Sequence, residues 1–438
     1  MALVRKAFIS LAVLYCMLFV SLTYWQVFAD LDTHPANPRY YQIFEKDRGV
    51  IYDRKGIPLA WSELDGASYT RIYAAAGLSP TLGYFHPRYG LTGLERLYHE
   101  DLNLGRSLIT TLDLDLQKTA AQLLGDQVGA VVVMRPSTGE ILALVSSPAV
   151  DGNLLGANWS DYLNDERSPF LNRVTHGLYP PGSTVKPIVY GTALLTGLTE
   201  SSTLWEDQGS LLIQNRSISN FGNKAHGSIP TDRALALSSN VVFAQLAVSL
   251  GDRLLEAYRS FGLGSSLVFD LENQGGHCPV TIASDYDAAQ LGIGQGKLLV
   301  TPLQMACLVS TIANDGVMMR PFVVWELRGG LRMRQIIRPQ SMNSVWEASL
   351  AQEIQKAMVL AAREGTAKTN TDLDLDYGGK TGTAQMALGR DHAWFIGFAP
   401  AAKPEVTVAV LMEHGGTGSQ VAVPLGTKLL KAALGLDE

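Results

Sequence analysis

The chain has 438 residues, of which 47% are hydrophobic and 17% are charged, and its formal net charge is -6. This composition excludes a disordered or fibrous protein, and the length is sufficient for more than one folded module. The acidic balance and the lack of a long run of Lys or Arg argue against a nucleic-acid partner.

Cysteine and histidine usage gives no support for a metal centre. The three cysteines, Cys16, Cys278 and Cys307, have no C-x-x-C spacing, and the eight histidines do not gather near them or near each other. We therefore expect neither a zinc site nor a disulfide framework, although a bridge between Cys278 and Cys307 stays open.

The N-terminus is predicted to carry a transmembrane anchor. Residues 7–29 form an uncharged, mostly apolar stretch of 23 residues. As a helix this stretch would be roughly 34 Å long, enough to cross a bilayer core of about 30 Å. Arg5 and Lys6 precede it, whereas Asp30 and Asp32 follow it. The positive-inside rule then keeps the N-terminus in the cytoplasm and exports the rest of the chain.

A cleaved signal peptide is the competing interpretation of the same stretch. Residues 27–29 offer an acceptable small-residue cleavage site. The apolar region is longer than the ~7–15 residues usual for a signal peptide, which favours a retained anchor. We therefore expect a single-pass protein with a cytoplasmic tail at residues 1–6 and an extracytoplasmic folded part.

Residues 30–106 are predicted to form a short pedestal. They contain few long apolar periodic runs and are rich in Gly, Pro, Tyr and Arg, which is typical of a small extended module. Residues 48–56 are expected to form a strand that enters a turn at residues 53–56. From the residues alone, an ordinary charged hairpin explains this segment as well.

A second module is predicted to span residues 107–438. Thr111 or Asp113 is expected to cap a helix that continues to Leu124. Two apolar runs, residues 129–134 and 140–145, flank a turn-forming segment and predict a β-hairpin. A polar loop is expected from 147 to 172.

The later part of this module predicts an α+β fold. Three more strands are expected at residues 377–384, 393–398 and 406–412, and a closing helix at residues 425–434. Helical patterns fill the middle, whereas strands lie towards both ends. We therefore expect an antiparallel sheet, built from early and late segments, with helices packed on it.

Ser183 and Lys186 form the first candidate catalytic motif, S-x-x-K. Such a pair is expected about once by chance in a chain of this composition, and Lys186 is the one lysine here with a serine three residues before it. Two prolines end the preceding extended segment, so Ser183 is predicted to lie in the first turn of a buried helix at residues 185–195. Lys186 would then face the serine from one turn later and could take its proton. The alternative is a helix-capping serine followed by a solvated lysine.

Ser238 and Asn240 form a second motif, S-x-N, at a polar break between helical patterns. Such a break can present side chains to a cleft, although most serines and asparagines there simply cap a helix. A second S-x-N at residues 341–343 shows how weak the pattern is alone. Capping of a helix from about residue 345 to 364 explains that copy.

Lys380, Thr381, Gly382 and Thr383 form the third motif, K-T-G-T, which follows a pair of glycines. Glycines in a strand allow another backbone to approach closely, as when an extended peptide docks along a sheet edge. The lysine and the two threonines could then bind a carboxylate. A solvated lysine on an edge strand is the alternative.

Taken in this order, the three motifs resemble those of the penicillin-binding proteins, the acyl-serine transferases that crosslink peptidoglycan. Further segments at 136–143, 179–186, 292–296, 301–304, 365–367 and 394–398 are similar to the same family. The resemblance covers roughly residues 107–435. It implies the penicillin-binding transpeptidase fold that serine β-lactamases share, an antiparallel sheet flanked by helices.

The front of the chain resembles class B members of this family. The single anchor, residues 48–56 and residues 93–95 are similar to the class B pedestal, and there is no room for a glycosyltransferase domain. Residues 37–39 resemble the division and sporulation branch, which includes mycobacterial members. The pedestal, residues 30–106, is much shorter than is usual in the family.

The resemblance also implies a role for each residue of the three motifs. Ser183 would attack the penultimate D-Ala carbonyl of a stem pentapeptide, with Lys186 as the proton acceptor, and the backbone N–H groups of Ser183 and Thr383 would form the oxyanion hole. Ser238 would help Lys186 to protonate the leaving D-Ala, and Asn240 would hold the substrate amide. The terminal carboxylate would bind in the segment formed by Lys380, Thr381, Gly382 and Thr383.

The same resemblance implies the ligands and partners. β-Lactam antibiotics would acylate Ser183 as substrate mimics, and neither a metal ion nor a diffusible cofactor is needed. A membrane-embedded lipid II polymerase of the shape, elongation, division and sporulation type is the expected protein partner. The chain would be anchored in the cytoplasmic membrane of a bacterium, with its catalytic domain outside.

Three alternative functions compete with the transpeptidase. A class A β-lactamase would need an E-x-x-x-N motif, which is absent, and the class C motif Y-x-N occurs only at Tyr162–Asn164, on the wrong side of Ser183. A D,D-carboxypeptidase uses the same acyl-enzyme and stays open. The third alternative is not an enzyme: the chain would be a non-catalytic activator of the lipid II polymerase.

Overall fold

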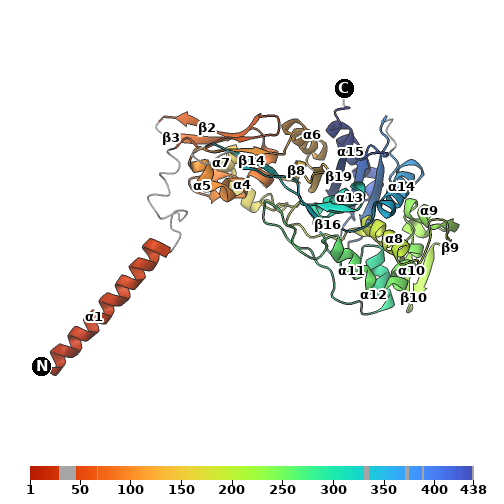
Figure 1. Ribbon diagram of the computed structural model, residues 1–438, viewed down its shortest axis with the longest axis horizontal. Helices are drawn as coiled ribbons and strands as arrows, with labels where there is room; N and C mark the ends of the chain where they lie inside the picture. The colour runs from red at the N-terminus through yellow and green to blue at the C-terminus, as the bar shows by residue number, and fades with distance from the viewer. Residues whose placement is uncertain (29–45, 67, 330–334, 370–373, 387–388, 437–438) are drawn as a thin grey trace.

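The computed structural model describes residues 1–28, 46–66, 68–329, 335–369, 374–386 and 389–436 (Figure 1). Ala29, Asp30, Asp32 and the motif at residues 37–39, on which several predictions rest, lie outside the described residues. Cys278 and Cys307 are both free thiols.

The predicted apolar stretch is helical. Helix α1 (Ala2–Thr23) continues into a π-helix, η1 (Tyr24–Phe28). A span of 23 residues, Val4–Gln26, has a mean hydropathy of 2.0, and none of it is buried against the rest of the protein. Figure 1 shows this helix projecting from the folded part. The helix begins earlier than predicted, so Arg5 and Lys6 lie within it.

A six-stranded sheet forms the part of the molecule nearest α1. Its strand order is β15-β14-β6-β1-β2-β3. The strands are β1 (Ile51–Tyr52), β2 (Pro58–Asp65), β3 (Ser68–Tyr73), β6 (Ser107–Thr110), β14 (Val324–Arg328) and β15 (Gln335–Ile336). As predicted, β1 leads into a turn after Asp53. The sheet crosses the expected module boundary, because β14 and β15 come from late in the chain.

Short elements complete this part, and buried charges hold it together. The short elements are η3 (Ala76–Leu78), α3 (Ser79–Leu82), β4 (Phe85–His86), β5 (Gly90–Leu91), α4 (Gly93–Leu97) and α5 (His99–Asn103). Arg48 Nε and Arg71 Nε each lie 2.7 Å from the carboxylate of Glu95, and all three side chains are buried. The segments that contain Arg48 and Arg71 are thereby joined to α4, which contains Glu95.

A five-stranded antiparallel sheet with the order β17-β18-β19-β7-β8 forms the main body. Its strands are β7 (Gly129–Met134), β8 (Ile141–Ser147), β17 (Gly378–Ala384), β18 (His392–Ala399) and β19 (Val406–Met412). The predicted hairpin and all three predicted late strands are therefore confirmed. These strands are buried on both faces, which explains why they appear in the sequence as continuous apolar runs.

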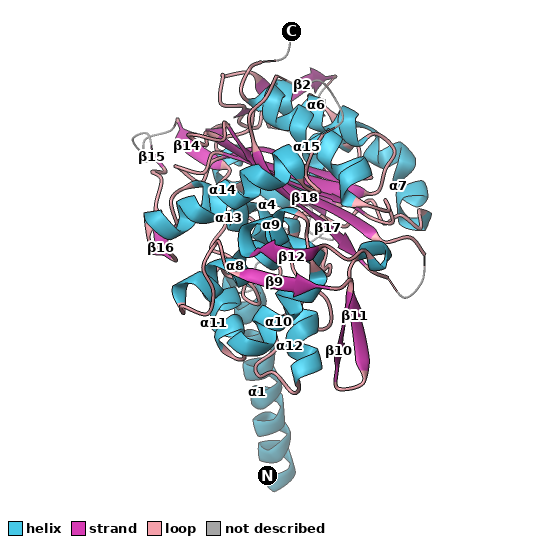
Figure 2. Ribbon diagram, turned by 90° about the vertical axis from the view of Figure 1, so that its right-hand side faces the viewer, coloured by secondary structure: helices cyan, strands magenta, loops and turns pink. Residues whose placement is uncertain are grey.

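Helices cover this sheet, and together they give the predicted α+β fold (Figure 2). α6 (Leu114–Leu124) and α15 (Gly418–Ala433) contact the sheet together with α13 (Pro302–Ala313), α14 (Ala348–Glu364) and, through its preceding turn, α8 (Lys186–Leu195). Further helices are α9 (Thr231–Ala236), α10 (Asn240–Leu250), α11 (Arg253–Ser260) and α12 (Asp285–Gly292). Asp113 caps α6 by accepting from the amides of Asp115 and Leu116.

Three short strand pairs lie beside the helices. β9 (Leu204–Asp207) pairs with β12 (Gly227–Pro230), β10 (Ser210–Ile213) with β11 (Arg216–Ser219), and β13 (Val317–Met319) with β16 (Ser341–Ser344). The pair formed by β10 and β11 is a hairpin that stands out from the helices (Figure 2).

Three local predictions were wrong. The expected loop at residues 147–172 contains η4 (Gly152–Leu154) and α7 (Leu155–Asn164). Asp151 caps η4, because its side chain accepts a hydrogen bond from the Asn153 amide. The closing helix starts at Gly418 rather than at residue 425, because Pro424 is accommodated within α15. Residues 341–343 do not cap a helix: they pair with β13 as part of β16, and α14 begins only at Ala348.

Candidate active site

Ser183 lies in a tight turn that leads directly into α8. The turn is a 3-10 helix, η5 (Gly182–Val185), and Lys186 is the first residue of α8, so the serine precedes the predicted α-helix rather than lying within it. Gly182 has φ 54° and donates its N–H to the carbonyl of Gly294 at 2.9 Å. A Cβ atom on Gly294 would lie 1.9 Å from Gly182 O. This close backbone contact fixes the turn that presents Ser183.

Lys186 is completely buried and makes three polar contacts. Its Nζ donates to Ser238 O at 2.8 Å, to Asn240 Oδ1 at 2.8 Å and to Ser238 Oγ at 3.4 Å. Within the described part of the chain, no hydrogen bond links this amine to Ser183 Oγ. Burial lowers the pKa of Lys186 well below its usual value, the charge of Lys380 lowers it further, and Asp207 opposes both. The neutral amine, which can accept a proton, is therefore reached at a lower pH than it is for a solvent-exposed lysine.

In the segment from Ser238 to Asn240, the middle residue caps a helix and the other two face the cleft. Ser239 caps α10, because its Oγ accepts from the amide of Val242 at 3.1 Å. Ser238 has φ 62°, an uncommon conformation for a residue other than glycine. Helix capping therefore explains the middle residue of the motif, and it leaves the side chains of Ser238 and Asn240 beside Lys186.

Lys380 lies on β17, which is an edge strand as predicted, but the lysine is not solvated. It is completely buried, and its Nζ donates to Ser238 Oγ at 2.9 Å and to Thr381 O at 3.0 Å. Burial lowers the pKa of Lys380 to about 7. The alternative of a solvated edge lysine is therefore wrong.

The remaining residues of the third motif bring β17 against the nucleophile turn. A Cβ atom on Gly382 would lie 2.8 Å from Pro181 O, so glycine allows the close approach. Thr381 Oγ1 donates to Thr366 Oγ1 at 2.7 Å, and Thr383 Oγ1 accepts from the amide of Gly418 at 3.4 Å.

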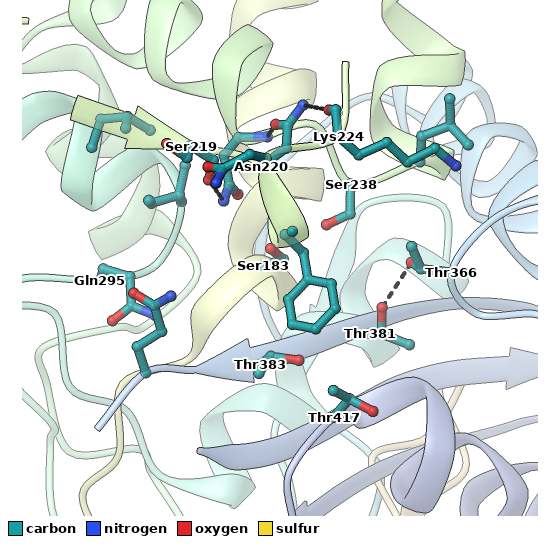
Figure 3. A pocket seen from close by; sticks show the side chains of 18 of the residues that line it. Ser183, Ser219, Asn220, Lys224, Ser238, Gln295, Thr366, Thr381, Thr383 and Thr417 are labelled. Atoms are coloured by element: carbon teal, nitrogen blue, oxygen red, sulfur yellow. Dashed lines mark hydrogen bonds between the residues drawn. The ribbon is translucent and has the colours of Figure 1, made fainter. Parts of the chain in front are cut away.

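A cavity of about 820 Å³ opens above these elements. Ser183, Ser238, Asn240, Thr381 and Thr383 all line it. Figure 3 shows Ser183 between Ser238 on one wall and the two threonines of β17 on the other. Segments separated by nearly 200 residues in sequence thus meet around one hydroxyl group. The arrangement combines a serine, two buried amines and hydroxyl donors, which suits acyl transfer.

Several residues of this site had no signal of their own in the sequence. Thr366 contacts Thr381, and Asn220 and Asp207 support the segment from Ser238 to Asn240. For residues 292–296 and 365–367, the family resemblance is the one signal in the sequence. No spacing rule points to Asp207, because its side-chain partners, Asn220 and Ser239, lie 13 and 32 residues away along the chain.

Comparisons with known proteins find similar sequences and similar folds. Residues 129–431 match the model of the penicillin binding protein transpeptidase domain. The chain is 34% identical to the peptidoglycan D,D-transpeptidase PbpA of Mycolicibacterium smegmatis, over 98% of both chains.

Two solved structures share the fold. The D,D-transpeptidase domain of a peptidoglycan glycosyltransferase from Eggerthella lenta is 30% identical, with a TM-score of 0.84, and the match covers 90% of this chain and all of that one. The penicillin G acyl-enzyme complex of penicillin-binding protein A from M. tuberculosis is 31% identical, with a TM-score of 0.82 over 89% of this chain and all of that one.

Proposed function

This chain belongs to the penicillin-binding protein transpeptidase family, in its class B branch, and on that premise we propose that it crosslinks peptidoglycan stem peptides through an acyl-enzyme on Ser183. It is a serine-type peptidoglycan D,D-transpeptidase. One observation supports these residue roles above all: the amines of Lys186 and Lys380 both donate to Ser238 Oγ, beside the cavity that Ser183 lines.

In the first half-reaction, Ser183 Oγ attacks the carbonyl carbon of the penultimate D-Ala of a stem pentapeptide. The O–C bond forms while the serine proton moves to Nζ of Lys186. The tetrahedral intermediate then collapses, the C–N bond breaks, and Lys186 returns the proton through Ser238 Oγ to the nitrogen of the departing D-Ala. In the free enzyme Lys186 is held by Ser238 and Asn240, and catalytic hydrogen bonds often tighten only when substrate is bound.

The backbone N–H groups of Ser183 and Thr383 are the proposed oxyanion hole. β17 and the nucleophile turn are close enough for this role, since a Cβ atom on Gly182 would lie 2.9 Å from Thr383 O. Donors fixed in advance stabilise the charge that develops on the carbonyl oxygen. Lys380, Thr381 and Thr383 would bind the terminal carboxylate along the strand that includes Gly382, and Asn240 would hold the donor amide.

In the second half-reaction, an amine from a neighbouring stem peptide attacks the ester carbonyl. Its proton passes to Lys186 and then to Ser183 Oγ as the ester bond breaks and the crosslinking amide forms. A D,D-carboxypeptidase would instead use water at this step. Penicillins would acylate Ser183 in the same way, as penicillin G does in penicillin-binding protein A from M. tuberculosis.

The test combines a covalent probe with a transfer assay. A fluorescent penicillin should label the wild-type protein at Ser183 and should not label Ser183→Ala. A donor pentapeptide mixed with a labelled amine acceptor should give the crosslinked product with release of D-Ala. Release of tetrapeptide with no crosslinked product would instead identify a carboxypeptidase, and labelling that survives Ser183→Ala would identify another nucleophile.

We further propose that α1 is a retained single-pass anchor and that residues 107–438 act outside the cytoplasmic membrane, on a pedestal formed from residues 30–106. The support is the exposed apolar span Val4–Gln26. Membrane-fraction protein that keeps its N-terminal residues by mass spectrometry is expected. A mature chain that starts near residue 30 would identify a signal peptide.

The proposed protein partner is a membrane-embedded lipid II polymerase, which a chain with one anchor and a pedestal could reach within the membrane. Co-purification from detergent should recover such a polymerase. If Ser183→Ala still supports full polymerase activity and cell growth, the chain is an activator whose own chemistry is dispensable.

A further inference from the structure

Asp207, at the end of β9, is a buried carboxylate held by neutral groups. Its side chain is completely buried. It accepts from the Gly209 amide at 2.9 Å, from Asn220 Nδ2 at 2.8 and 2.9 Å, and from Ser239 Oγ at 2.6 Å. Among the described residues, it forms no ion pair with a Lys, Arg or His side chain. Burying a carboxylate with no cation beside it costs folding free energy, so a nearby positive charge would stabilise it.

The residues bound to Asp207 organise the start of α10. Asn220 Oδ1 accepts from the amides of Asn240 at 2.7 Å and Val241 at 3.2 Å, and Ser239 Oγ accepts from the amide of Val242. Consecutive amides at this helix end are therefore held by two side chains that both bind Asp207. Figure 3 shows Asn220 on the cavity wall beside Ser238.

The same network reaches the amine of Lys186. Asn240 Nδ2 donates to Ser219 O at 2.7 Å, and Asn240 Oδ1 accepts from Lys186 Nζ at 2.8 Å. Asp207 is thus connected to Lys186 through Asn220 and Asn240. Each link is a short hydrogen bond between groups that are at least partly buried.

The charges around Lys186 give this connection a consequence for catalysis. Burial and the charge of Lys380 lower the pKa of Lys186, and the charge of Asp207 raises it. His226 also lines the cavity; burial lowers its pKa, Asp207 raises it, and Lys224 and Lys186 lower it. During acylation Lys186 must carry a proton in a fully buried position near a second lysine. Asp207 is the carboxylate whose charge offsets that cost.

We propose that Asp207 is a positioning residue: its buried carboxylate fixes the segment from Ser238 to Asn240 and stabilises the ammonium form that Lys186 adopts when it takes the proton of Ser183. This inference rests on the proposed roles of Ser183 and Lys186. Asp207 acts through Asn220, Ser239 and Asn240 and does not contact substrate.

Asp207→Asn in the full-length, detergent-solubilised protein tests the charge, because asparagine keeps the shape of the side chain. We measure the second-order rate constant of labelling by a fluorescent penicillin from pH 5 to pH 10. Loss of the negative charge lowers the pKa of Lys186 further, so the acid limb of the profile should move to lower pH by about one unit. The rate on the plateau should fall ~3-fold, because a weaker base accepts the serine proton less readily.

Ser239→Ala is the matched control, since it removes one hydrogen bond to Asp207 and keeps the carboxylate. It should lower the melting temperature but leave the acid limb where it is in the wild type. If Asp207→Asn does not fold, Asp207→Ser carries the same charge test and leaves room for a water between Asn220 and Ser239.

An acid limb in Asp207→Asn or Asp207→Ser that coincides with that of the wild type would overturn the proposal. A shift of equal size in Ser239→Ala would also overturn it, because the effect would then come from packing. Labelling of the wild type at Ser183, located by peptide mass, tests the proposed function separately. The two ideas can therefore fail independently.

Discussion

Lys380 and Lys186 both direct their amines at one hydroxyl, with Nζ of Lys380 2.9 Å and Nζ of Lys186 3.4 Å from Ser238 Oγ. Both side chains are completely buried, and burial lowers the pKa of each. Two ammonium groups this close and this poorly solvated repel each other, so one amine is readily neutral. Lys186, whose pKa is also lowered by the charge of Lys380, is the better candidate for the neutral base.

The first prediction concerns the alkaline side of the pH profile. Burial lowers the pKa of Lys380 to about 7, so its positive charge is present below this pH and is lost as the pH rises through it. An anionic β-lactam binds best to the charged form. The second-order labelling rate constant of the free enzyme should therefore fall above about pH 7, whereas the limiting rate constant at saturation should fall only at higher pH, because the bound anion raises the pKa of Lys380.

Lys380→Arg provides the control for this profile. A guanidinium keeps its charge throughout the range, so any labelling by this variant should lack the alkaline limb. A wild-type rate constant that stays level up to pH 9 would contradict the assignment of the limb to Lys380.

The second prediction concerns Gly294, which sets the backbone that carries Ser183. Gly294 has φ 73°, and an added Cβ atom would lie 1.9 Å from Gly182 O. Gly294→Ala should displace the nucleophile turn and misplace the N–H of Ser183, with a loss of penicillin labelling of roughly 100-fold. Gly197→Ala is the matched control, because Gly197 has φ 68° but no neighbouring atom within 4 Å. It should cost only about 1 kcal/mol of backbone strain and leave labelling unchanged.

A structured turn and full labelling in Gly294→Ala would contradict this account. The turn can be followed by the protease sensitivity of residues 180–190, which should rise in Gly294→Ala and not in Gly197→Ala.

The parts of the fold that the sequence predicts are those fixed by local pattern. The runs at residues 129–134 and 406–412 are apolar at nearly every position because both faces of the sheet are covered. Asp113 is recognisable as a cap because the amides that donate to it, those of Asp115 and Leu116, are close to it in sequence. Such signals need no knowledge of distant segments.

The parts that could not be predicted depend on contacts between distant segments. β14 completes the six-stranded sheet through pairing with β6, more than 200 residues earlier, and the sequence of neither strand indicates its partner. For the active site, motifs gave Ser183, Lys186, Ser238 and Lys380, but the burial of both lysines emerges only from the packing of α8, α10 and β17. Asp207 was missed for the same reason.

The third prediction concerns the buried charges of Arg48, Arg71 and Glu95. Burial alone would raise the pKa of Glu95, but Arg71 and Arg48 hold it below its usual value. The stability from this cluster is therefore present at neutral pH and is lost as the pH falls through the pKa of Glu95 in the folded protein. Glu95→Gln would leave two buried guanidinium groups without a counter-charge and should cost about 3–5 kcal/mol, measured by chemical unfolding.

The exposed pair formed by Arg96 and Glu272 is the control for this cluster, since their side chains are 64% and 80% exposed. Arg96→Gln should change the free energy of unfolding by less than about 1 kcal/mol. Equal effects of Glu95→Gln and Arg96→Gln would show that the buried cluster does not stabilise this part of the fold.

The last prediction concerns Thr366, whose hydroxyl lies 2.7 Å from that of Thr381. In the free enzyme Thr381 donates to Thr366. When a substrate carboxylate arrives, the Thr381 proton can turn towards it, and Thr366 can then donate to Thr381 in its place. Thr366→Val removes this second donor, so the Thr381 hydroxyl pairs less well in the complex. Loss of one hydrogen bond of this kind costs about 1 kcal/mol, or roughly fivefold in affinity.

Saturation kinetics with a β-lactam separate binding from acylation in this variant. The dissociation constant of the initial complex should rise roughly fivefold in Thr366→Val, while the acylation rate constant changes less than about twofold, because Thr366 does not contact Lys186 or Ser183. Thr366→Ser keeps the hydroxyl and should behave like the wild type. A fall in the acylation rate constant with unchanged binding would mean that Thr366 aligns the oxyanion hole through β17 rather than the carboxylate site.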